Sequence, residues 1–247
     1  MALDDDRVST DKLERIVSSE PVLAGRLVQL ANSAALNFSG KKVTDLRTAI
    51  ARIGFAMVRT TSMAYALSQL RKAEKLKNMR EPLNALWMRS TVVAAACRVV
   101  AVRLSRVNPD MAMLAGLLHG IGELYLLTRV GEYPSLVGGD GGRAIIRDWQ
   151  SAVAKAILEN WEIDPTIATA VAEFEILDRE HAGPVDLTDV LTIGFLLGSY
   201  MNHPDSLETN MADVKICQRL GLTRADYEAL ISGSREQMDA LREALDY

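Results

Sequence analysis

The chain has 247 residues, of which 49% are hydrophobic and only 5% aromatic, enough for one large domain or two small lobes with a buried core. Its net charge is −4, its N-terminus is acidic and polar rather than a secretory signal, and its longest uncharged run, Val190–Pro204, is too short to cross a bilayer. Cys97 and Cys217 lie far apart and match neither a disulfide framework nor a zinc ribbon, so we expect packed thiols in a reducing cytoplasm.

Apolar residues recur at helical spacing along nearly the whole chain, and no convincing strand pattern interrupts them. Ser19, Thr44 and Asn108 are predicted to cap helices, Pro82 to break the chain between two long helices, and Val137–Gly142 to form a flexible loop. In chain order, the first helices are predicted from Ser9 or Thr10, from Pro21, from Asp45 to Ile53 and from Gly54 to Met79. The next are predicted from Leu83 to Ser105, from Pro109 through the segment AGLLHGIGELYLL, and over Arg143–Trp161, Pro165–Leu177 and Leu187–Met201. Two or three short helices are predicted to follow, with a stop at Gly221 and a cap at Thr223.

The three histidines bear on whether the chain holds a metal centre. A two-metal hydrolase needs several His, Asp or Glu side chains that converge on the ions. His181 and His203 lie in turn-like segments, and we expect both to be solvated loop residues. His119 is followed by Gly120, and Glu123 lies one helical turn further on. Because one His–Glu pair holds an ion poorly, we expect a lone histidine that is hydrogen-bonded within an apolar helix.

Positive charge is concentrated in the first half of the chain. Residues 41–106 contain 14 Lys or Arg and three acidic residues, an excess of 11 positive charges, so the rest of the chain carries −15. Solvated helix ends explain this most simply, but an anionic ligand such as a nucleic acid or a cyclic dinucleotide is an alternative. The candidate anion-binding residues are Arg71, Lys72, Lys75, Lys77 and Arg80.

Five segments carry motifs in a characteristic order. They are SSEPVLAGRLVQLANSAALN, VTDLRTAIARIGFAMVRTTSM, LWMRSTVVAAACRVVA, DMAMLAGLLHGIGELYLL and AVAKAILENWEIDPTIATAV. Each is similar to a motif of the HDOD family, the HD-related output domain of bacterial signalling proteins; the fourth, for example, is similar to A-G-L-L-H-D-I-G. The ordered set covers most of the chain and resembles this family closely.

The resemblance implies an all-α multi-helix bundle related to the HD phosphohydrolases. In that family arrangement, an N-terminal helical lobe, here residues 1–80, would pack on an HD-like lobe, here residues 81–247. Together the two lobes would form one HDOD unit.

The chain departs from the superfamily at the positions that resemblance assigns to metal ligands. Arg89 stands where the family often has His, and Gly120 stands where the namesake Asp would be. The pattern often has another His near Gln150, and its usual His-His pair is replaced over residues 173–175 by Glu-Phe-Glu. His119 alone survives as a relic of the ligand set. We therefore expect no metal, no cofactor and no catalytic residue.

Three functions remain open from the sequence. The first is a non-catalytic signalling module in the cytoplasm that binds a protein partner, with no membrane association and with a homo-oligomer left open. The second is a residual metal-dependent phosphohydrolase with a rebuilt site around His119 and Glu123. The third is binding of an anionic ligand to the basic region, for which nucleic acid is the less favoured partner.

Overall fold

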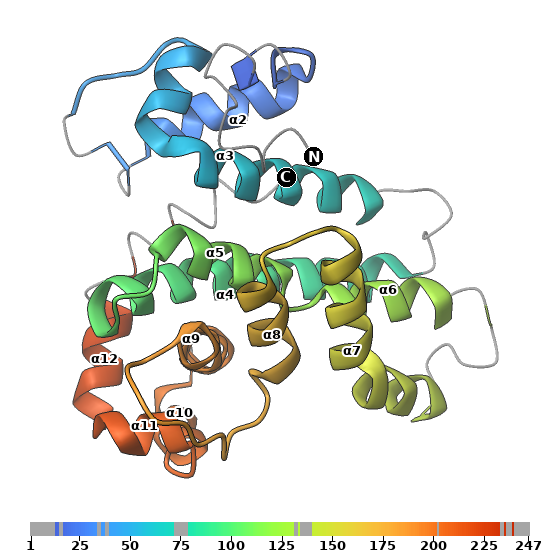
Figure 1. Ribbon diagram of the computed structural model, residues 1–247, viewed down its shortest axis with the longest axis vertical. Coiled ribbons are helices and arrows are strands. Elements are labelled where there is room, and N and C mark those ends of the chain that lie inside the picture. The colour runs from blue at the N-terminus through green and yellow to red at the C-terminus, as the bar shows by residue number, and fades with distance from the viewer. Residues whose placement is uncertain are drawn as a thin grey trace.

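All regular structure in the described part of the chain is α-helical, as Figure 1 shows. The computed structural model describes residues 13–14, 17–33, 36–37, 40–71, 79–130, 133, 140–201, 203–232, 235 and 239. The helices are α2 (Pro21–Ala31), α3 (Leu46–Arg71), α4 (Arg80–Leu104), α5 (Pro109–Leu118), α6 (Ile121–Val130), α7 (Asp140–Asn160), α8 (Pro165–Glu173), α9 (Leu187–Tyr200), α10 (Pro204–Met211), α11 (Lys215–Leu220) and α12 (Arg224–Ser232). The predicted all-α bundle is confirmed.

Two of the predicted N-terminal caps are wrong by one residue. α2 follows Glu20, which makes no side-chain cap, rather than Ser19. At the start of α3 the carboxylate of Asp45, not the hydroxyl of Thr44, accepts a hydrogen bond from the backbone N–H of Thr48 at 2.8 Å. A carboxylate in this place also meets the positive end of the helix dipole, which favours Asp45 over its neighbour.

α3 is kinked at Gly54, where the sequence predicts the end of one helix and the start of the next. Gly54 has φ +78° and ψ 163°, a conformation that a residue with a Cβ adopts only with strain. Ile50 before the kink and Met57 after it are both buried. The predicted continuation of this helix over residues 72–78 lies outside the described residues.

α4 begins at Arg80, so the predicted break at Pro82 is wrong. Pro82 lies in the first turn of α4, where backbone N–H groups have no partner within the helix, and a proline there costs no hydrogen bond. α3 lies against both α4 and α5. The division into lobes of residues 1–80 and 81–247 stays a prediction.

α4 occupies the centre of the core, between α5 and α9. A Cβ added to Gly116 of α5 would lie 2.7 Å from the Cα of Ala94, and one added to Gly194 of α9 would lie 2.5 Å from the Sγ of Cys97. These glycines therefore let both helices approach the α4 backbone directly. Cys97 and Cys217 are buried and free, which confirms the predicted packing of both thiols.

Within the described part of the chain, two helical stretches are long and apolar enough to cross a membrane by length and composition alone. They are α4 and residues 109–129, and 67% and 72% of their most apolar windows are buried inside the protein. The core helices of soluble proteins pass the same test when they are mostly buried, so the burial is consistent with a soluble protein.

The segment AGLLHGIGELYLL forms two helices, although the sequence predicts one. α5 ends at Leu118, a turn covers His119 and Gly120, and α6 begins at Ile121. The predicted cap at Asn108 is confirmed, because its side-chain oxygen accepts hydrogen bonds from the first backbone N–H groups of α5. The break places His119 at the end of a helix rather than inside one.

α6 packs very closely on α7, at Gly122. A Cβ added to Gly122 would lie 2.0 Å from the backbone oxygen of Gln150, so a glycine is needed for the two backbones to lie this close. α7 itself begins at Asp140, so the part of the predicted loop from Asp140 to Gly142 is helical, whereas residues 137–139 lie outside the described residues.

Replacing Gly122 by Ala is expected to lower the free energy of unfolding by up to about 3 kcal/mol, because the new methyl group would force the α6 and α7 backbones apart. Urea denaturation followed by circular dichroism measures the change. Gly25→Ala in α2 is the matched control, because its Cβ would meet nothing within 4 Å. The control is expected to gain about 0.4–1 kcal/mol. Equal effects of the two substitutions would contradict the packing argument.

Candidate functional site

Five side chains from five parts of the fold meet beside the turn between α5 and α6. Arg89 comes from α4, His119 follows α5, Glu123 lies in the first turn of α6, Gln150 lies on α7, and Glu175 follows α8. We call these five residues the substituted site. It brings together most of the positions that resemblance to the HD proteins assigns to metal ligands.

An ion pair crosses the substituted site. The Nη2 atom of Arg89 donates a hydrogen bond to the Oε2 atom of Glu123. The Arg89 side chain is 39% exposed and that of Glu123 is 23% exposed, so both charges lie at the edge of the helix bundle. The carboxylate that the sequence offers as a partner of His119 in a rebuilt metal site is therefore already bonded to a cation.

Glu175 makes the second polar link of the site. Its two carboxylate oxygens accept hydrogen bonds from Nε2 of Gln150 at 3.2 and 2.9 Å. Burial raises the pKa of Glu175 above its ordinary value, and the negative charge of Glu123 raises it further, whereas Gln150 and Arg89 act to lower it. The pKa of Glu175 therefore depends on both charges of the neighbouring ion pair.

His119 is a buried, neutral side chain. Its Nδ1–H donates to the carbonyl oxygen of Gly116 at 2.7 Å, and its ring meets those of Phe174 and Phe195 edge-on, with centroids 5.6 and 5.5 Å away. Burial lowers the pKa of His119 to about 4, and the charge of Arg89 adds to this effect. The Nε2 atom is buried and has no hydrogen-bond partner among the described residues.

Gly120 offers no ligand to the substituted site. A Cβ added there would lie 2.6 Å from Cδ1 of Leu86 and 3.3 Å from Oγ of Ser90, so side chains of α4 fill the space where a longer residue would begin. Gly120 is therefore closely packed against α4.

The residues present do not fit the divalent metal centre that the fold family implies. His119 and Glu175 could each offer a ligand atom, but the guanidinium of Arg89 binds the carboxylate of Glu123, and its charge also acts on Glu175. A divalent ion at about 4 Å from that guanidinium would be repelled by roughly 2–8 kcal/mol. The geometry favours a metal-free polar network.

The candidate anion-binding residues fall largely outside the described part of the chain. Lys72, Lys75 and Lys77 lie outside the described residues. Arg71 is the last residue of α3 and Arg80 is the first residue of α4. The anion site therefore stays a prediction.

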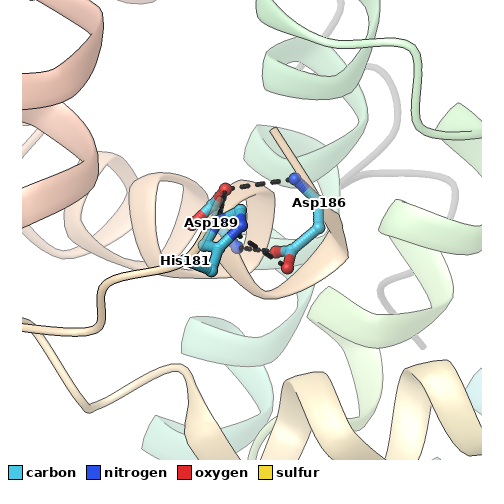
Figure 2. Close-up of side chains that lie close together, drawn as sticks. All are labelled: His181, Asp186 and Asp189. Atoms are coloured by element: carbon cyan, nitrogen blue, oxygen red, sulfur yellow. Dashed lines mark hydrogen bonds and ion pairs between the residues drawn. The ribbon is translucent and has the colours of Figure 1, made fainter. Parts of the chain in front are cut away.

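A second polar cluster, which the sequence did not predict, lies at the start of α9 (Figure 2). Asp186 caps the helix by accepting from the backbone N–H of Asp189 at 3.0 Å, and Asp189 accepts in return from the backbone N–H of Asp186 at 3.1 Å. His181 donates from Nε2 to Oδ2 of Asp189 at 2.8 Å and is only 20% exposed. The expectation of a solvated loop histidine is wrong for His181.

Two arginines saturate the carboxylates of this cluster. Arg219 donates to Oδ2 of Asp189 at 2.8 Å, and Arg179 donates to Oδ2 of Asp186 at 2.7 Å. Burial acts to raise the pKa of Asp186, but the hydrogen bond and charge of Arg179 outweigh it, so the pKa is lowered. One ligand atom each from His181, Asp186 and Asp189 lies within 4.8 Å of the others, a spacing that could hold a metal ion. With both guanidinium groups in place, the cluster instead ties the preceding loop and α11 to α9.

An open pocket of about 450 Å³ adjoins this second cluster. Its cations are already paired: Lys215 contacts Glu180 at 3.1 Å, and the two arginines bind the carboxylates of the cluster. Little positive charge is therefore left for an anionic ligand. The lining residues are Arg179, Glu180, His181, Asp189, Lys215, Ile216, Gln218 and Arg219.

Only part of the second cluster leaves a signal in the sequence. Asp186 and Asp189 show the spacing of a capping box before an apolar run, which predicts a helix start. Arg219 lies 30 residues beyond Asp189, and no local pattern links the two.

The sequence profile of the HDOD domain matches residues 1–176. Comparison with curated protein sequences finds no match. The profile match covers the substituted site and ends just before the second cluster begins.

Solved structures share the fold along nearly the whole chain. A protein of Shewanella amazonensis SB2B, provisionally described as a metal-dependent phosphohydrolase, has a TM-score of 0.81 and 21% identity, over 99% of this chain and 88% of its own. An HDOD domain protein of unknown function from Geobacter sulfurreducens has a TM-score of 0.66 and 21% identity, over 99% and 88%. A protein of Marinobacter aquaeolei VT8, provisionally described as a signal transduction protein, has a TM-score of 0.59 and 18% identity, over 98% of this chain and 56% of its own.

Proposed function

Because the chain belongs to the HDOD domain family, we propose that it is a non-catalytic regulatory module of bacterial signalling that binds a protein partner in the cytoplasm. The fold that it shares with a protein provisionally described as acting in signal transduction supports this assignment. The proposal has two parts, the lack of catalysis and the binding of a partner, and each has its own test.

The observation that carries the first part is the bond between Arg89 and Glu123. Metal-dependent phosphohydrolases use ions to polarise the phosphate and to generate hydroxide from water. Here a side-chain cation binds the carboxylate nearest to His119 in sequence, and the single histidine is turned toward a backbone carbonyl. A guanidinium at this place has no open coordination position and generates no hydroxide.

The purified protein is expected to contain no stoichiometric transition metal and to hydrolyse no bis(p-nitrophenyl) phosphate with added Mn²⁺, Fe²⁺ or Mg²⁺. Gly120→Asp is expected to behave in the same way, because one added carboxylate leaves Arg89 in place and the other ligands missing. Plasma mass spectrometry and absorbance at 405 nm provide the measurements. Metal-dependent turnover by the unaltered protein would support the residual phosphohydrolase instead.

Exposed aromatic side chains support the second part of the proposal. Trp149 on α7 is 60% exposed, and it directly precedes Gln150 of the substituted site. Tryptophan is enriched among the residues that dominate binding between proteins. A partner recovered from native cytosol by the tagged protein and identified by mass spectrometry is expected to be lost with Trp149→Ala. Trp161→Ala, at the residue that directly follows the end of α7 and is 40% exposed, is the matched control.

A further inference from the structure

The substituted site has an uneven charge balance. Among its five residues, Arg89 is the only cation, Glu123 and Glu175 are the two acids, and burial keeps His119 neutral at pH 7. Arg89 bonds to Glu123 directly and attracts Glu175 electrostatically, whereas the two acids repel each other. One guanidinium therefore interacts with both carboxylates, by a direct bond to Glu123 and by electrostatic attraction to Glu175.

These charges come from separate elements of the fold. Arg89 lies on α4, Glu123 on α6, and Glu175 in the segment after α8, where Gln150 links it to α7. The Nε atom of Arg89 is buried, so the base of the guanidinium is drawn into the bundle rather than held in solvent. A divalent ion bound by carboxylates from several elements would have the same position and the same electrostatic effect.

We propose that the guanidinium of Arg89 is a built-in cation that holds α4, α6 and the segment after α8 together in place of a bound metal ion. Arg89 is a positioning residue in this role, because it acts on Glu123 and Glu175 rather than on a substrate. The inference concerns the cohesion of the site and does not rest on the proposed function. It requires that the positive charge of Arg89, and not only the volume of its side chain, stabilises the fold.

Melting temperatures of four variants test the role of the charge. Arg89→Met keeps the length of the side chain without its charge and is expected to lower the melting temperature by about 2–4 °C. Arg89→Lys is expected to keep more than half of the stability that Arg89→Met loses. In the Glu123→Gln background, Arg89→Met is expected to cost less than half of what it costs in the unaltered protein. Additive losses, or equal losses with Lys and Met, would overturn the proposal.

Metal ions provide a second, independent test. With a built-in cation, the melting temperature of the unaltered protein is expected to change by less than about 1 °C on addition of EDTA, Mn²⁺ or Zn²⁺. A clear stabilisation by either ion that Glu123→Gln abolishes would show that the substituted site, rather than the cluster at the start of α9, takes a metal despite Arg89. This result would overturn the inference but would leave partner binding untouched.

The titration of Glu175, followed by carboxyl-carbon NMR, separates an electrostatic role from a packing role. Arg89→Met is expected to raise the pKa of Glu175 because an attracting charge is lost, and Glu123→Gln is expected to lower it because a repelling charge is lost. Glu123→Gln keeps this test available if Arg89→Met fails to fold. The control is Arg98→Met. Arg98 lies elsewhere on α4 and pairs with Asp110 of α5, so its replacement is expected to leave the pKa of Glu175 unchanged. An unchanged pKa in both site variants would overturn the proposal.

Discussion

Asp189→Ala is expected to lower the free energy of unfolding by about 3–5 kcal/mol, the loss typical of a buried carboxylate removed from its charged partners. Asp189 is only 4% exposed, and its carboxylate binds His181 and Arg219 and lies 3.4 Å from Arg179. Its removal leaves two guanidinium groups without their shared anion and also breaks the capping box of α9. Urea denaturation at pH 7, followed by circular dichroism at 222 nm, measures the loss.

Asp178→Ala is the matched control for Asp189→Ala. Asp178 is an exposed carboxylate in the loop that leads to the same cluster. Its replacement is expected to change the free energy of unfolding by no more than about 0.5 kcal/mol. A loss below about 1 kcal/mol for Asp189→Ala would show that water replaces the buried carboxylate without difficulty.

Acidification from pH 7 to pH 4 is expected to cost the unaltered protein about 3 kcal/mol of stability through His119 alone. The pKa of this histidine is lowered from 6.5 to about 4, so the unfolded chain binds a proton that the folded chain rejects. The contribution is complete above pH 6.5 and is lost as the pH falls toward 4. Urea midpoints measured across this range give the pH dependence.

His119→Gln isolates that contribution, because glutamine does not titrate. Whatever its stability at pH 7, the variant is expected to lose about 3 kcal/mol less than the unaltered protein between pH 7 and pH 4. Carboxylates titrate in both proteins, so their effects cancel in the comparison. Parallel pH profiles would mean that His119 is solvated and protonated in the folded protein.

Local signals in the sequence predicted the helices whose ends are set by a few neighbouring residues. Asn108 caps α5 as predicted, Gly221 ends α11 in the left-handed conformation, and Thr223 caps α12 through hydrogen bonds with Asp226. These features depend on residues within three positions of one another. The predicted start of α4 was wrong because a proline such as Pro82 is compatible both with a break and with the first turn of a helix. Only packing decides between the two.

The candidate sites could be predicted only in part, because their partners are distant in sequence. Resemblance marked Arg89 and His119 as family positions, yet nothing in the sequence placed the guanidinium of Arg89 on Glu123, 34 residues away. The contact between Gln150 and Glu175 spans 25 residues and also requires the tertiary fold. Resemblance to the family identifies which ligands are missing but not which bonds replace them.

The packing of α9 on α4 has a practical consequence for choosing fragments to express. The profile of the HDOD domain ends at residue 176, whereas α9 begins at Leu187 and covers the face of α4 that carries Cys97. A fragment cut at residue 176 would expose a groove lined by small and apolar side chains along the centre of its own core. The smallest piece expected to fold with a covered core therefore extends through α9, beyond the boundary that sequence comparison alone would suggest.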